Sequence, residues 1–189
     1  MKVRVIPMGK LYANCCVITD DIGNAAVIDP GGDPAPVTEL IENSGCRLRA
    51  VLLTHGHDDH TEGAFRLADS FDAPVIIGRG DAYRLGREPD MELDGGETLR
   101  FGEIELEVIA APGHTEGGMC YLMGDILFAG DTLFRQSVGR TDMPGGSWPT
   151  LEETLTKLKE RFGGSDVRIV PGHGEMTDFR FEMENNPWL

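Results

Sequence analysis

Four apolar segments of this chain end in the same way, with a small residue and then a histidine or an aspartate. Residues 51–54 lead into His55, 108–111 into Pro112-Gly113-His114, 126–129 into Gly130-Asp131, and 167–170 into Pro171-Gly172-His173. Apolar runs of this length are typical of buried β-strands. Rigid strands hold their loops at one rim, where functional groups are found, and glycine allows the backbone close approach there. The pattern therefore predicts a sheet-rich fold with polar groups gathered at one rim.

All five histidines belong to this pattern. His55, His57 and His60 lie in the stretch Thr54-His55-Gly56-His57-Asp58-Asp59-His60, and His114 and His173 each follow a Pro-Gly pair. A single His-x-His sequence is a weak signal. Neutral imidazole is, however, the commonest metal ligand, and no histidine is left for a surface role. The joint placement of the five histidines therefore favours a metal site.

The donor set is large enough for two ions. His55 and His57, two positions apart, can face the same way from a strand end, whereas Asp59 and His60 begin the next helix and can face a second position. With Asp131, His114 and His173 added and one carboxylate shared, these donors suit two borderline divalent ions, zinc first, with iron or manganese as alternatives. Structural zinc sites favour cysteine and closed coordination. A set without cysteine favours catalysis.

Composition excludes several classes of partner. A length of 189 residues makes one domain, 1–189, the default. The net charge of −15 and the absence of any Lys/Arg run argue against nucleic acid and anionic membranes as partners. The four cysteines form no C-x-x-C pair, and there is no signal-peptide or membrane-spanning run. We expect a cytoplasmic protein with reduced thiols and a small-molecule substrate; its oligomeric state is left open.

The hydrophobic pattern alternates short strands with helices. Strands are expected at residues 3–6, 15–19, 25–29, 50–54, 74–77, 98–101, 104–110, 119–123, 126–129 and 167–170. Helices are expected at 34–43, 60–71, 151–162 and 176 to about 185. Thr150 and Glu153 form a candidate capping box for the third helix. Residues 133–148 lack periodicity and are expected to form a functional loop. This mixture indicates a sheet-rich α/β or α+β domain, without fixing its topology.

Taken together, these motifs resemble the metallo-β-lactamase superfamily. The matching segments are Thr-His-Gly-His-Asp-Asp-His at 54–60, Pro-Gly-His-Thr at 112–115, Gly-Asp-Thr-Leu-Phe at 130–134 and Pro-Gly-His-Gly at 171–174. The resemblance implies an α+β fold, a four-layer αββα sandwich with a metal site at one edge. Within the superfamily the chain is most similar to the glyoxalase II group, especially its small single-domain bacterial members, through Gly139-Arg140-Thr141-Asp142.

The resemblance also implies roles for the donors. His55, His57 and His114 would hold the first ion, Asp59, His60 and His173 the second, and Asp131 would bridge both. Two-domain glyoxalase II enzymes carry a C-terminal helical domain that helps to bind glutathione. Only 16 residues follow His173, so that domain is expected to be absent and glutathione recognition is not carried over. Superfamily ribonucleases need insertions and a basic surface, which this sequence lacks.

The expected activity is metal-assisted hydrolysis of a thioester, such as a 2-hydroxyacyl thioester, by a hydroxide bridging two metal ions. Asp59 is the expected catalytic residue, which orients the water or accepts its proton. Arg140 is a candidate partner for a substrate carboxylate, or else pairs with Asp142. Asp29 either fixes an imidazole or only forms a strand-end turn.

Two other functions compete with hydrolysis. In a mononuclear iron dioxygenase acting on a persulfide, the resemblance would place the iron on His55, His114 and Asp131. In a non-enzymatic binding module, the metal site would serve folding alone. Lactonase or β-lactamase activity is a weaker enzymatic alternative.

Overall fold

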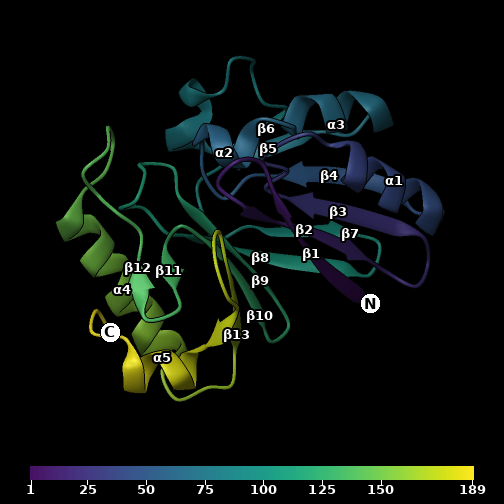
Figure 1. Ribbon diagram of the computed structural model, residues 1–189. Coiled ribbons are helices and arrows are strands. Elements are labelled where there is room, and N and C mark those ends of the chain that lie inside the picture. The colour runs from purple at the N-terminus through teal and green to yellow at the C-terminus, as the bar shows by residue number, and fades with distance from the viewer.

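The computed structural model describes residues 1–189 and has four layers, with two sheets face to face between two layers of helices (Figure 1). The first sheet has the strand order β1-β2-β3-β4-β5-β6, and the second has the order β14-β13-β10-β9-β8-β7. The expected αββα sandwich is therefore confirmed.

The elements follow one another along the chain without long gaps. The strands of the first sheet are β1 (Lys2–Met8), β2 (Ala13–Thr19), β3 (Asn24–Ile28), β4 (Arg47–Leu52), β5 (Val75–Gly78) and β6 (Met91–Leu93). Those of the second are β7 (Thr98–Phe101), β8 (Ile104–Ala110), β9 (Met119–Met123), β10 (Ile126–Gly130), β13 (Arg168–Pro171) and β14 (Thr177–Asp178). The helices are α1 (Ala35–Ser44), α2 (Asp58–Thr61), α3 (Ala64–Phe71), the 3-10 helix η1 (Arg79–Arg84), α4 (Trp148–Phe162) and α5 (Phe179–Asn185).

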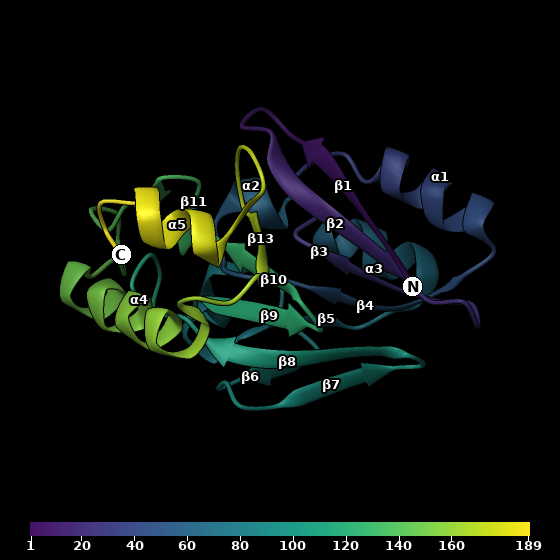
Figure 2. The same cartoon turned by 90° about the horizontal axis from the view of Figure 1, so that it is seen from below.

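Alternation along the strands creates three apolar cores. In β2, Cys16 and Ile18 face the second sheet and join the inner core, whereas Cys15 and Val17 join the core beneath α1 and α3. A third core lies between the second sheet and the helices α4 and α5. Figure 2 shows the two helical layers on opposite sides of the sheets. The period of two residues in each strand thus allows both faces of each sheet to be covered.

The helix expected at residues 60–71 is wrong in its bounds. The structure begins it at Asp58 and divides it into α2 and α3, with the break at Glu62 and Gly63. The Gly63 amide donates to Pro30 O at 2.8 Å, and a Cβ at Gly63 would lie only 2.4 Å from Gly32 O. The close approach of the loop after β3 therefore interrupts the helix.

The C-terminal third differs from expectation in three places. Helix α4 begins at Trp148 rather than Leu151, and its N-cap is Ser147, whose side chain accepts from the Thr150 amide, so the predicted capping box is wrong. Helix α5 begins at Phe179, because 177–178 pair with β13 as β14. The expected irregular loop contains a hairpin of β11 (Leu133–Phe134) and β12 (Ser137–Val138).

The expectation of one functional rim is met by the topology. Strand β4 is parallel to β3 and β5, and β10 is parallel to β13. The segments that follow β4, β8, β10 and β13 carry all five histidines and Asp131. No helix combines the length and the apolar character that crossing a membrane requires.

Asp20 connects the two sheets at the strand ends opposite the histidine-bearing rim. Its buried carboxylate accepts hydrogen bonds from the Ile22 and Asn24 amides, from the Asn24 side chain, and from the Glu103 amide in the turn between β7 and β8. Burial would raise the pKa of Asp20, but these donors outweigh it and lower that pKa to about 2. The ionised carboxylate is thus the stabilised form.

We expect Asp20→Ala to lower the free energy of unfolding by about 2–3 kcal/mol, since several charge-assisted hydrogen bonds are lost. The wild-type contribution is complete above about pH 4, the ordinary carboxyl range, and is lost as the pH falls towards the folded-state pKa of about 2. Denaturant unfolding from pH 2 to 7 measures this. Asp21→Ala is the control, because Asp21 pairs only with the exposed N-terminus. Equal stability of the two variants at pH 7 would contradict the role.

Candidate metal centre

Seven side chains meet at the rim in two groups with a carboxylate between them. One group is His55, His57 and His114; the other is Asp59, His60 and His173. Asp131 lies between them, with Oδ1 3.4 Å from His60 Nε2 and Oδ2 3.5 Å from His114 Nε2. The structure therefore brings together every donor that the sequence singled out.

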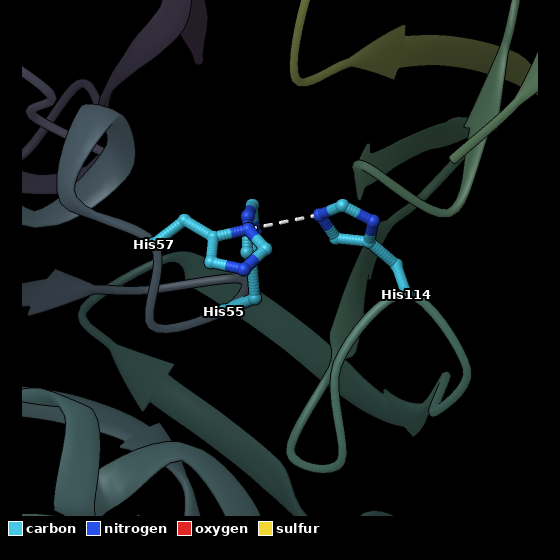
Figure 3. A group of neighbouring side chains, drawn as sticks. All are labelled: His55, His57 and His114. Carbon is cyan, nitrogen blue, oxygen red and sulfur yellow. Dashed lines mark hydrogen bonds between the residues drawn. The ribbon is translucent and has the colours of Figure 1, made fainter. Parts of the chain in front are cut away.

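The first group combines the loop after β4 with the loop after β8. Figure 3 shows the rings of His55 and His57 facing that of His114. The His57 Nδ1 and His114 Nε2 atoms lie 3.0 Å apart, and the ring centroids of the three residues are 4.7–4.9 Å apart. Ligands at 2.0–2.1 Å from a tetrahedral zinc ion lie about 3.3 Å from each other. The spacing fits one shared cation.

The second group has the same spacing. The His60 and His173 Nε2 atoms are 3.2 Å apart, and Asp59 Oδ2 lies 3.1 Å from His173 Nε2. Gly172 makes the approach possible, since a Cβ there would lie only 2.1 Å from Asp131 Oδ1 and 2.8 Å from the His60 ring. This is the close backbone approach for which glycine is suited.

Hydrogen bonds on the outer nitrogens fix which ring atoms face inward. His60 Nδ1 is 3.0 Å from Asp29 Oδ2, His114 Nδ1 is 2.7 Å from Arg140 O, and His173 Nδ1 is 3.0 Å from Leu11 O. Each acceptor requires a proton on Nδ1, so in the neutral ring Nε2 carries a lone pair. The lone pairs of His60 and His173 therefore face each other, unless a proton or a cation lies between them.

The orientation of the His55 ring is fixed in a similar way, through Thr54. The Thr54 hydroxyl donates to Asp29 Oδ2 at 2.6 Å, so its oxygen accepts from His55 Nδ1 at 3.1 Å. His55 Nε2 is left buried and without a hydrogen-bond partner, as is Asp131 Oδ1. An unsatisfied buried polar atom costs about 1–3 kcal/mol. A bound divalent ion would satisfy both atoms, so the residues present fit a metal centre.

Electrostatics distinguishes the two groups. Burial lowers the pKa of His55 and of His57, so both rings are neutral at pH 7 and can act as metal ligands. Burial would also lower the pKa of His60, but the Asp29 and Asp131 carboxylates together outweigh it and raise that pKa to about 10. The hydrogen bond from His173 lowers the pKa of Asp59 to about 2. A cation entering the second group must therefore displace a proton.

Asp29 performs both of the roles weighed from the sequence. It turns the chain after β3 with a left-handed φ of 53°. Its buried carboxylate also accepts from the Thr54 amide at 2.7 Å and from His60. Because Asp29 orients His60 directly and His55 through Thr54, it couples the two groups.

Other supporting residues could not be found from the sequence. Asn14 Nδ2 donates to Pro171 O at 2.9 Å and to Gly174 O at 3.0 Å, which fixes the His173 loop. Asp81 is fully buried, and its carboxylate accepts from the Gly56 amide at 2.8 Å and the Gly117 amide at 3.0 Å. Asp81 thus joins the two loops of the first group. Neither residue belongs to a motif, so no local signal marks them.

We expect Asp81→Ala to lower the free energy of unfolding by about 2–4 kcal/mol, because two buried amides lose their acceptor. We also expect weaker metal binding in the first group, by about 10-fold to 100-fold, as is usual for residues that support ligands. Thermal unfolding and zinc titration against a competing chelator measure the two effects. Asp69→Ala, which removes an exposed carboxylate, is the control. Unchanged zinc affinity in Asp81→Ala would contradict this role.

An open cleft of about 970 Å³ leads to the donors. Its wall includes the hairpin β11–β12, which α5 holds from behind. The buried Glu182 side chain accepts from the Gln136 amide at 2.8 Å, and Asn186 Nδ2 donates to Ser137 O at 3.1 Å. Arg140 lines the cleft, but its guanidinium forms two bonds to Asp142 of 2.6 and 2.8 Å. It is the Arg140 backbone carbonyl, rather than the guanidinium, that contacts a metal-binding side chain, namely His114.

Comparison with known proteins agrees with this geometry. Residues 8–173 match the family model described as the metallo-beta-lactamase superfamily. Hydroxyacylglutathione hydrolase GloC of Haemophilus influenzae is 34% identical over 211 residues, an alignment that covers 100% of this chain and 98% of the relative.

Solved structures are similar over the same extent. The crystal structure of the BLEG-1 B3 metallo-beta-lactamase has a TM-score of 0.92, with 29% identity and 99% of each chain covered. ETHE1 from Myxococcus xanthus has a TM-score of 0.89, with 27% identity over 99% of this chain and 84% of that one. TTHA1623 in a di-iron-bound form has a TM-score of 0.85, with 31% identity over 99% of this chain and 100% of that one.

Proposed function

Because this chain belongs to the metallo-β-lactamase superfamily, we propose that it is a binuclear metal-dependent hydrolase of thioesters, such as a 2-hydroxyacyl thioester. The observation that carries the proposal is the pair of three-donor groups, with Asp131 between them, at the base of one open cleft. The hydroxyacylglutathione hydrolase among the relatives supports a thioester as the substrate class.

The proposed roles follow the two groups. His55, His57 and His114 hold one ion, Asp59, His60 and His173 hold the other, and Asp131 is shared. Nitrogen and oxygen donors without cysteine suit zinc first. The di-iron form of TTHA1623 supports iron as an alternative, and manganese also accepts such donors.

When bound, such ions would supply a water whose pKa is lowered to about 7 and a Lewis acid for the substrate carbonyl. The Asp59 carboxylate, whose low pKa keeps it ionised at neutral pH, would orient an attacking water and accept its proton. The main-chain carbonyls of Leu11 and Arg140 hold the rings of His173 and His114 in place. A thiolate is a good leaving group, so the chain needs no general acid to protonate it.

The competing iron dioxygenase would use only His55, His114 and Asp131. It gives no function to the second group, whose His60 and His173 nitrogens lie 3.2 Å apart beside Asp59. This second set of facing donors favours two ions over one, and therefore favours hydrolysis. A purely structural metal would give no reason for the open cleft.

A thioester panel combined with an oxygen electrode tests the proposal. We expect the zinc-loaded protein to release free thiol from 2-hydroxyacyl thioesters without consuming oxygen. Oxygen uptake with glutathione persulfide, and no thiol release, would establish the dioxygenase instead. No turnover of either substrate class would favour the binding module. The metal-free protein is the control for spontaneous hydrolysis.

A further inference from the structure

The walls of the cleft above the metal donors are apolar. Its hydrophobic lining consists of Leu11, Tyr83, Phe134, Val138 and Met143. Leu11 is 64% exposed and Tyr83 is 67% exposed, so large apolar surface lies at the mouth. Exposed apolar surface that is gathered around a cleft marks a binding site.

Both arginines of the cleft are already paired. Arg140 is held by the two bonds to Asp142. Arg84 Nη2 donates to Pro144 O at 2.7 Å, and its Nε lies 3.3 Å from the buried carboxylate of Asp81. A substrate carboxylate would therefore have to compete with the groups that these two guanidinium groups already bind.

Apart from the metal donors and the two arginines, Asp58 is the only charged residue of the lining. Asp58 is exposed, and Glu116, which accepts the Tyr83 hydroxyl at 3.0 Å, is not part of the lining. Lys10 precedes Leu11 in the sequence but does not line the cleft. Arg135, beyond Phe134, lies 3.5 Å from Glu175. The protein thus offers apolar contact, and no cationic side chain without a partner, to the part of a substrate that lies outside the metal centre.

We propose that the substrate is a thioester whose thiol half is uncharged and apolar, rather than the doubly carboxylated glutathione. This inference rests on the thioester hydrolysis proposed above. Apolar walls reward the burial of aliphatic groups, whereas a carboxylate placed against them loses its water without gaining an unpaired cationic side chain. Because both arginines are paired within the protein, this substrate preference follows from the chain's own residues.

The first test uses two thioesters with the same 2-hydroxyacyl group, one of glutathione and one of the neutral N-acetylcysteamine. With zinc-loaded protein, we expect kcat/KM for the neutral ester to be higher by about tenfold or more. We expect added salt to change the kcat/KM of both esters little, because no unpaired cationic side chain of the cleft attracts the glutathione carboxylates. A higher kcat/KM for the glutathione ester, falling as salt is added, would overturn the inference while leaving thioester hydrolysis intact.

Binding provides a readout that does not depend on turnover. S-hexyl-N-acetylcysteamine and S-hexylglutathione are thioethers without a scissile bond, and calorimetry on the zinc-loaded protein gives their Kd values. We expect the neutral compound to bind more tightly by about tenfold. Tighter binding of S-hexylglutathione would overturn the inference even if no thioester were cleaved.

Leu11→Ala tests the apolar wall. It removes the side chain at the mouth but keeps the backbone carbonyl that holds His173. We expect the KM for the neutral ester and the Kd of the neutral thioether each to rise about fivefold to tenfold, with kcat nearly constant. Ile22→Ala is the matched control, because Ile22 is 65% exposed in a turn outside the cleft. Wild-type Kd in Leu11→Ala would contradict the role of this wall.

Discussion

Asp131→Ala is expected to abolish hydrolysis and metal retention together. Asp131 is the only carboxylate within 4 Å of imidazole nitrogens from both groups, so its loss removes a ligand from each ion. We expect activity to fall by about 10³-fold or more, as the attacking water is no longer held between two cations. The purified variant should hold much less metal than the wild type. Thiol release and elemental analysis measure the two effects.

The variant must be shown to fold before these losses are interpreted. Far-UV circular dichroism should match that of the wild type, because the three apolar cores do not depend on Asp131. Asp125→Ala is the matched control: it removes an exposed aspartate, paired with Arg168, that directly precedes β10, the strand that Asp131 directly follows. Wild-type turnover by Asp131→Ala would refute the shared-ligand role.

Asp59→Asn is expected to have the second largest effect. The amide keeps the size of the side chain but cannot accept the proton of water. It is also a weaker ligand than a carboxylate for the second ion. We expect kcat to fall by about 10²-fold to 10³-fold, the usual contribution of a general base. The KM should change less, because Asp59 is not part of the apolar wall. Steady-state kinetics at saturating zinc separates loss of the base from loss of metal.

Asp58→Asn provides a close comparison. Asp58 precedes Asp59 in the same helical turn but is exposed and contacts no donor of either group. Its replacement should change kcat by less than about threefold, as is usual for a surface substitution. If Asp59→Asn behaved like Asp58→Asn, Asp59 would not be the base, and a non-enzymatic role for the site would gain support.

The meeting of the donors at one rim could be predicted from the sequence, although the strand order could not, because each donor lies in a segment that follows an apolar strand. The structure shows parallel neighbours such as β10 and β13 ending at the same edge. The alternation of Cys15 and Cys16 between two cores was predictable from the two-residue period of a strand. Local pattern and tertiary structure agree at these positions.

The supporting residues could not be predicted, because their partners lie far along the chain. Asp81 bonds the Gly117 amide across 36 residues, and Asn14 bonds Pro171 O across 157. Such bonds depend on the packing of two sheets, and no spacing rule reveals them. The break between α2 and α3 has a similar cause, since Gly63 packs against the loop after β3. Helical periodicity carries no information about that contact.

The stoichiometry of bound metal tests the central claim most directly. The account rests on two separate sets of facing donors with Asp131 between them. Elemental analysis of protein purified without added metal, followed by zinc titration of the metal-free chain, should give two divalent ions per chain. A single ion per chain at saturating metal would contradict the account.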